Sequence, residues 1–197
     1  MTAVMPEREV HIEGVISSMR DLAARLSEIQ GLRVEIIGGN ILVSPTPSFK
    51  HGKIVLQLIR QLDPQLPADR MPQPSYSVES VEDDEDYCSP DLMIVPEELG
   101  DEEGWLAPAD IVDMAVEVVS KGNVPADTTL KPRAYARWGI PIYLMIDPRN
   151  GDIVLYSDPV DGRYRGRHDY TFGDTVTLPA PLAGISIESK EFPRYGG

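Results

Sequence analysis

The chain has 197 residues, of which 42% are hydrophobic, and its 32 acidic and 18 basic residues give a formal net charge of −14. This length and composition predict one compact domain over residues 1–197. The acidic balance argues against a broad nucleic-acid-binding surface, because Lys and Arg supply most of the affinity for phosphates.

The apolar runs and the cysteine content exclude further classes of protein. No apolar run approaches the length of a membrane span, and the start, MTAVMPEREVH, lacks the apolar core of a signal peptide. We therefore expect a cytoplasmic protein without a membrane partner. The single cysteine, Cys88, excludes an internal disulfide and a cysteine-cluster metal site. Its acidic neighbours would raise the pKa of the thiol, so a nucleophilic role is not expected.

The first third of the chain predicts a helix, a hairpin and a second helix. Residues 7–29 have an amphipathic helical pattern that ends at Gly31. Residues 33–44, RVEIIGGNILVS, predict a hairpin with the paired glycines in its turn. Ser48 is a suitable N-cap for a helix to about residue 62. Its buried stripe is expected to contain Ile54, Leu58 and Leu62.

The next segments are shorter. Residues 63–74 carry four prolines and predict a loop, and residues 76–81 alternate like a strand. Residues 83–89 predict an acidic turn, residues 91–95 an apolar strand, and residues 97–109 an acidic loop.

The stretch 111–147 predicts a βαβ unit around which the rest is organised. Its two ends are dense in Val, Ile, Met and Leu, as in strands buried on both faces. The segment between them ends as a helix, because Leu130, Ala134 and Trp138 recur at helical spacing before Gly139. Two strands joined by a crossover helix are expected to be parallel neighbours.

The last quarter begins with a second hairpin signal at Asn150 and Gly151. Residues 163–177 predict short, polar strands interrupted by glycine. The tail from residue 178 has one short apolar run and is expected to wrap back onto the core.

Three charged residues point to a chemical site. Asp91 opens an apolar strand, and Glu117 lies near the end of another, where a carboxylate is costly unless it is paired or binds a metal. Two carboxylates at strand ends suit Mg²⁺ or Mn²⁺. A nearby lysine, Lys131, could neutralise charge that develops on a phosphate. Such a set suits phosphodiester hydrolysis.

Several motifs resemble one family. The chain has PD at 90–91, VEVVS at 116–120, D-x₃-K-x₃-Y at 127–135 and GIPIYLMID at 139–147. Together with EIIGGNILVSP at 35–45 and His51, these resemble the Uma family of restriction endonucleases, in the PD-(D/E)xK nuclease superfamily. The resemblance covers about residues 34–164. It implies an α/β fold with a restriction-endonuclease-like core, a mixed central sheet flanked by helices, and an added N-terminal helix and hairpins.

The resemblance implies Asp91 and Glu117 as metal ligands. The superfamily pattern places a lysine two residues after the acidic residue, where this chain has Val119, so Lys131 of the following helix becomes the candidate. Helical spacing places Asp127, Lys131 and Tyr135 on one face. Pro132 fits this helix if Thr129 is the N-cap, and it would push Lys131 away from helical geometry.

Most of these residues also have a plain structural alternative. Asp91 is a ligand or a surface carboxylate at the start of a strand, and Glu117 is a ligand or one half of a buried ion pair with a nearby Arg or Lys. Lys131 either assists hydrolysis or forms an ordinary ion pair with Asp127. Glu35 is a further ligand or the outward residue of a hairpin, and His51 contacts a phosphate or is polar surface. Ser120 and Tyr135 are candidates for groups that orient the ligands.

The leading hypothesis is a Mg²⁺- or Mn²⁺-dependent endonuclease that acts on nucleic acid, with DNA as the expected substrate. Cutting both strands of a duplex favours a homodimer, by family analogy. The alternative is a catalytically inactive binding or assembly module that keeps the nuclease fold, which the acidic charge favours. A structural α/β domain with buried ion pairs is a third reading.

Overall fold

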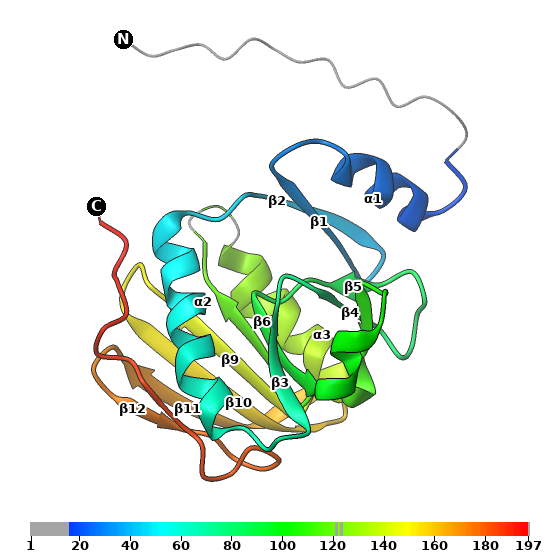
Figure 1. Cartoon of the computed structure of the whole chain (residues 1–197). Coiled ribbons are helices and arrows are strands. Elements are labelled where there is room, and N and C mark those ends of the chain that lie inside the picture. Colours follow the sequence, from blue (N-terminus) through cyan, green and yellow to red (C-terminus); the bar gives the residue numbers. More distant parts are fainter. Residues whose placement is uncertain (1–15, 121, 123, 197) are drawn as a thin grey trace, which may run out of the picture.

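The computed structural model describes residues 16–120, 122 and 124–196, and Figure 1 shows their arrangement. The helices are α1 (Met19–Ser27), α2 (Phe49–Leu62) and α3 (Lys131–Arg137). Short helical turns cover Asp63–Gln65, Glu97–Asp101, Ala109–Ile111 and Ala126–Leu130. The strands are β1 (Leu32–Ile37), β2 (Asn40–Pro45), β3 (Arg70–Pro74), β4 (Ser77–Glu79), β5 (Tyr87–Cys88), β6 (Leu92–Pro96), β7 (Leu106–Pro108), β8 (Met114–Val118), β9 (Ile142–Asp147), β10 (Asp152–Val160), β11 (Arg163–Thr171), β12 (Thr175–Thr177) and β13 (Ser186–Glu188).

A six-stranded mixed sheet forms the centre, in the order β11-β10-β9-β8-β6-β3. β8 and β9 are parallel neighbours, with Val116 opposite Leu144, whereas the other strand pairs of this sheet are antiparallel. The predicted βαβ unit is therefore confirmed. The second predicted hairpin is confirmed as well, because β9 and β10 pair with Asp147 opposite Asp152.

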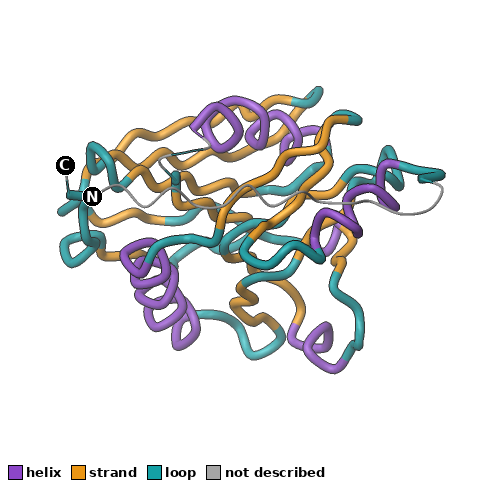
Figure 2. Tube along the Cα trace, turned by 90° about the horizontal axis from the view of Figure 1, so that it is seen from above, coloured by secondary structure: helices purple, strands orange, loops and turns teal. Residues whose placement is uncertain are grey.

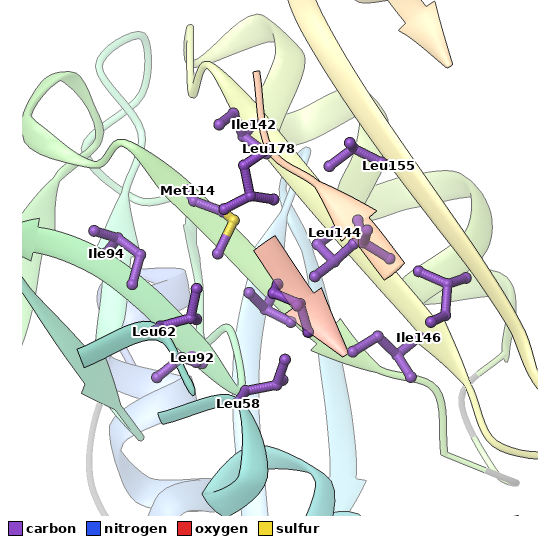
Figure 3. Close-up of a cluster of buried hydrophobic side chains, with 14 of the residues drawn as sticks. Leu58, Leu62, Leu92, Ile94, Met114, Ile142, Leu144, Ile146, Leu155 and Leu178 are labelled. Atoms are coloured by element: carbon purple, nitrogen blue, oxygen red, sulfur yellow. The ribbon is translucent and has the colours of Figure 1, made fainter. Parts of the chain in front are cut away.

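Side chains alternate between the two faces of this sheet, and each face has its own helix (Figure 2). One face packs against Ile54, Leu58 and Leu62 of α2, which are fully buried as predicted. Figure 3 shows Leu58 and Leu62 in this cluster. β13 and Phe192 add to the same cluster, so the tail wraps back as expected. The other face packs against Tyr135 and Trp138. The core therefore has two apolar layers around the sheet.

Leu58 gives a direct test of the α2 layer. Replacing it with Ala is expected to lower the free energy of unfolding by about 2–5 kcal/mol, because the side chain is fully buried against the sheet and its removal leaves a cavity. Urea denaturation measures this change. The control is Leu56→Ala in the same helix, where Leu56 is 45% exposed and a change within about 0.5 kcal/mol is expected. Equal losses in both variants would contradict the packing described.

A second sheet, in the order β2-β1-β5-β4-β7, lies beside the first and carries the predicted hairpin. Gly38 and Gly39 form its turn with φ of 59° and 70°, a region that favours glycine. The carboxylate of Asp86 accepts hydrogen bonds from both glycine amides, at 2.6 and 3.0 Å. This clamp connects the hairpin to the segment before β5.

The prediction for the first helix needs correction at both ends. Within the described residues the first helix begins at Met19, because Ser18 is its N-cap and accepts a hydrogen bond from the Asp21 amide. Residues 16–18 are therefore not helical, and residues 7–15 of the prediction lie outside the described residues. The helix ends at Ser27, before Gly31.

Several predicted loops contain strands. Residues 70–74 form β3, an edge strand of the central sheet, and edge strands tolerate proline because their outer N–H groups need no partner. β5 lies inside the predicted acidic turn, and β7 inside the predicted acidic loop. Residues 163–171 form the single long strand β11, so Gly166 does not interrupt it. Gly166 lies opposite Ser157, and a Cβ at this position would collide with the Ser157 side chain.

No helix in the described part of the chain is long and apolar enough to cross a membrane.

Candidate active site

The two predicted ligands meet because β6 runs antiparallel to β8, which places the start of β6 beside the end of β8. The Asp91 amide donates to the carbonyl of Val116 at 3.0 Å, and the amide of Val118 donates to Asp91 Oδ2 at 2.8 Å. Glu117 lies between these two contacts along β8. Asp91 and Glu117 line one cavity of about 660 Å³. The structure thus brings together two carboxylates that are distant in sequence.

Lys131 lies at the centre of the carboxylates. Its Nζ atom is 2.7 Å from Glu117 Oε1, 3.0 Å from Glu35 Oε1 and 3.5 Å from Asp127 Oδ1. The lysine side chain is only 3% exposed. An ammonium group is costly to bury alone, and these carboxylates offset that cost. The i,i+4 pair with Asp127 exists, but it is the longest of the three contacts.

The helix that carries Lys131 differs from the prediction at its start. Residues Ala126–Leu130 form a π-helical turn, in which the Lys131 amide donates to the carbonyl of Ala126, and α3 continues from it. Thr129 is therefore not the N-cap. Lys131 has helical angles, φ −63° and ψ −42°, although Pro132 follows it. The wider π turn precedes the proline, and π turns of this kind are frequent at functional sites.

Asp91 is held by two positive or potentially positive groups. Its Oδ1 atom is 2.9 Å from Arg33 Nη1 and 3.0 Å from His51 Nε2. Burial by itself would raise the pKa of Asp91, but the contact with His51 and the charges of Arg33 and Lys131 lower it to about 2. Asp91 is therefore ionised at neutral pH.

Burial raises the pKa of two other acidic groups of the site, whereas Lys131 stays charged. Burial raises the pKa of Glu117 well above its usual value, against the attraction of Lys131. Burial also raises the pKa of Asp127, to about 6. For Lys131, burial opposes the charge, but Glu117, Glu35 and Asp127 together hold the pKa well above its usual value. The lysine is thus a permanent cation at neutral pH.

Glu35 does not point outward from the hairpin. It is 1% exposed, and its Oε1 atom accepts from the Ser89 amide at 2.7 Å in addition to the Lys131 contact. Tyr135 also reaches the site, because its hydroxyl donates to Glu117 Oε1 at 2.9 Å. Ser120 lines the cavity. His51 is buried in the first turn of α2, so it is not polar surface.

Among the residues of the site that sequence reasoning missed are Arg33 and Tyr195. Arg33 lies two residues before Glu35 in β1, so the period of a strand already places both on one face, and this signal could have found it. Tyr195 lines the cavity from the tail, where no local pattern marks it.

The residues fit a divalent cation of the Mg²⁺ type. The cavity is lined by four acidic residues, Asp91, Glu117, Glu35 and Asp127, and by three basic residues, Arg33, Lys50 and Lys131, so the acidic groups outnumber the basic ones by one. Lys131 and Tyr135 both donate a hydrogen bond to Oε1 of Glu117, so neither of them occupies its other carboxylate oxygen, Oε2. Within the described residues no three His, Cys, Asp or Glu side chains form a ready cage for a metal. Mg²⁺ usually takes only one or two protein carboxylates and keeps several waters.

Cys88 is fully buried, and burial first and the Glu35 charge second raise the pKa of its thiol well above the usual value. It is therefore not an activated nucleophile.

Comparisons with known proteins agree with this architecture. A family model described as "Uma2: Putative restriction endonuclease" matches residues 20–189. The structure resembles a solved protein from Anabaena variabilis ATCC 29413, described as "a putative nuclease belonging to DUF820", with a TM-score of 0.64 and 17% sequence identity. That match covers 86% of this chain and 96% of the other. No curated protein matches the sequence. The expected restriction-endonuclease-like α/β core is confirmed, and the chain belongs to the Uma2 family.

Proposed function

We propose that this protein is a metal-dependent nuclease that hydrolyses phosphodiester bonds in nucleic acid, with DNA as the expected substrate. The observation that carries the proposal is the arrangement of Asp91, Glu117 and Lys131 around one cavity at the strand ends. Membership of a family described as restriction endonucleases and a fold shared with a protein described as a nuclease support it.

In this proposal Asp91 and Glu117 hold Mg²⁺ or Mn²⁺. A bound divalent ion would lower the pKa of a water and offset charge on a phosphate oxygen. Lys131 supplies a fixed positive charge beside Glu117 for the phosphate oxygens. In the hydrolysis the oxygen of a water molecule bonds to phosphorus and the water loses a proton to solvent, while one P–O ester bond breaks and its oxygen leaves with a proton from solvent. Tyr135 and Glu35 hold Glu117 and Lys131 in place. Arg33 and His51 hold Asp91 ionised.

The alternative is a binding or assembly module that keeps the cavity without cleavage. The net charge of −14 favours it, because an acidic protein repels a polyanion. The two functions differ in one observable, since both permit metal binding but only the nuclease cuts.

The test incubates the purified protein with labelled single- and double-stranded DNA and RNA, with Mg²⁺, with Mn²⁺ or with EDTA. The proposal expects cleavage with either metal and none with EDTA. Calorimetric binding of Mn²⁺ without cleavage of any of these substrates would favour the binding module. Cleavage that continues in EDTA would contradict a metal-dependent mechanism.

Phe49 is a candidate contact for the nucleic acid. It is the first residue of α2, lines the cavity and is fully exposed, so it has no packing role. Stacking of a base on an aromatic ring contributes about 1–3 kcal/mol. Phe49→Ala is therefore expected to weaken oligonucleotide binding about 10-fold without changing stability. Fluorescence anisotropy in a cleavage-deficient background measures the binding.

Leu56→Ala is the matched control for Phe49→Ala, because Leu56 is an exposed apolar residue of the same helix that does not line the cavity. Equal affinity of the Phe49 variant and this control would remove Phe49 from the substrate contacts.

We also propose a homodimer, because cutting both strands of a duplex usually requires two sites. Light scattering at several protein concentrations tests this state, and a monomer throughout would contradict it.

A further inference from the structure

The last described residues, 189–196, form a strap beside α2 (Figure 1). The side chain of Gln57 donates to the carbonyl of Glu191 at 3.2 Å, and Lys50 donates to the carbonyl of Arg194 at 3.0 Å. These two contacts follow α2 toward its first turn. The strap therefore approaches the end of α2 that carries His51.

The strap is anchored at Tyr195 and at the residues just before it. Phe192 is buried and meets Phe172 edge to face, with ring centroids 5.6 Å apart. The guanidinium of Arg194 lies 5.9 Å from the centre of the Phe172 ring. The amide of Tyr195 donates to the carbonyl of Pro148 at 2.9 Å, directly after β9. This anchoring fixes the backbone at Tyr195 relative to the central sheet.

The phenol of Tyr195 points to the first turn of α2. Its oxygen is 3.4 Å from Nδ1 of His51, which lies in that turn. Burial raises the pKa of Tyr195 to about 12, so the hydroxyl keeps its proton at neutral pH. A protonated phenol can donate to an unprotonated ring nitrogen.

His51 connects this phenol to Asp91. The imidazole is 7% exposed, and its Nε2 atom is 3.0 Å from Asp91 Oδ1. This distance is that of a close polar contact. Among the described residues, however, Nε2 has no hydrogen-bond partner, because an N–H on Nε2 would not point directly at the carboxylate oxygen. A proton on Nε2 suits a neighbouring carboxylate and leaves Nδ1 as an acceptor in the neutral ring. A donor placed at Nδ1 therefore favours this tautomer and helps to fix the orientation of the ring.

We propose that Tyr195 is a positioning residue that, by donating to Nδ1 of His51, selects the Nε2–H tautomer and holds the Nε2 atom beside Asp91. The inference rests on the proposed metal-binding role of Asp91. In metal sites, groups behind the ligands fix ligand orientation, and their loss typically weakens metal affinity about 10–100-fold. The strap thus acts on the site through a chain of three side chains.

The first test measures the His51 tautomer in the metal-free protein by nitrogen-15 NMR of the imidazole, with His51→Gln assigning the signals. The wild type is expected to show a protonated Nε2 and an unprotonated Nδ1. Tyr195→Phe is expected to shift both nitrogens toward a mixture of tautomers. Unchanged nitrogen shifts in Tyr195→Phe would overturn the inference, whatever the protein does with metal.

The second test measures Mn²⁺ affinity by calorimetry. Tyr195→Phe is expected to weaken it about tenfold. His51→Gln is expected to weaken it at least as much, and the double variant to match His51→Gln alone, because Tyr195 acts only through His51. Additive losses would show that Tyr195 acts by another route and would overturn the inference.

Tyr164→Phe is the matched control, because it also removes a tyrosine hydrogen bond, from its hydroxyl to the carbonyl of Ile140 at 2.8 Å, at a residue outside the cavity lining. It is expected to leave the Mn²⁺ affinity and the His51 nitrogens unchanged. A wild-type protein that does not bind Mn²⁺ would refute the proposed function, and the tautomer measurement would still decide the role of Tyr195.

Discussion

Replacing Glu117 with Gln is expected to lower metal-dependent cleavage by about 10³-fold or more, because an amide cannot supply the negative oxygen that a divalent ion requires. The shape of the side chain is kept, and its Oε1 position can still accept from Tyr135. Initial rates on a labelled oligonucleotide at saturating Mg²⁺ measure the loss.

The stability of this variant is the control. Burial raises the pKa of Glu117, so a neutral side chain is tolerated there, and Lys131 keeps Glu35 and Asp127 as partners. We expect the melting temperature to stay the same or to rise. Asp91→Asn is expected to lose activity equally but to lose stability as well, because Arg33 and His51 lose a charged partner. Cleavage that persists in both variants would refute the assigned roles.

Replacing Lys131 with Met is expected to lower the free energy of unfolding by about 3–5 kcal/mol, because Glu35, Glu117 and Asp127 then remain buried without their cation. Urea denaturation without divalent metal measures the loss. Adding Mg²⁺ is expected to recover part of it, since a bound cation replaces the missing charge; at a hundred times its dissociation constant a ligand adds about 2.7 kcal/mol.

Lys53→Met supplies the comparison for Lys131→Met, because Lys53 is an exposed lysine of α2 and its loss is expected to cost about 0.5 kcal/mol or less. If both substitutions cost the same, Lys131 does not hold the carboxylate cluster together.

Local patterns in the sequence predicted the parts of the fold that carry the site. The apolar runs flanking 121–139 gave the parallel pair β8 and β9, and Ser48 marked the start of α2 correctly. The placement of Asp91 and Glu117 at strand ends also agrees with the structure. These features depend on the periodicity and capping of neighbouring residues, which a sequence displays directly.

Most of the predictions that failed share one physical cause, because they depend on how distant parts of the chain pack together. The prolines of β3 indicate a loop until the strand is known to lie at a sheet edge. The π turn before Lys131 departs from regular helical geometry, and the helical spacing of Leu130, Ala134 and Trp138 does not indicate it. Tyr195 reaches His51 only because the tail folds back along α2. Contacts between distant segments of this kind have no local signature.

A crystal of this protein soaked in Mn²⁺ shows whether Asp91 and Glu117 bind one metal ion, because the anomalous signal of manganese locates the ion without an activity assay. We expect one strong peak within coordination distance of carboxylate oxygens of both Asp91 and Glu117, and we expect this peak to disappear in Glu117→Gln. A peak elsewhere, or an empty cavity at saturating Mn²⁺, would contradict the proposed metal site.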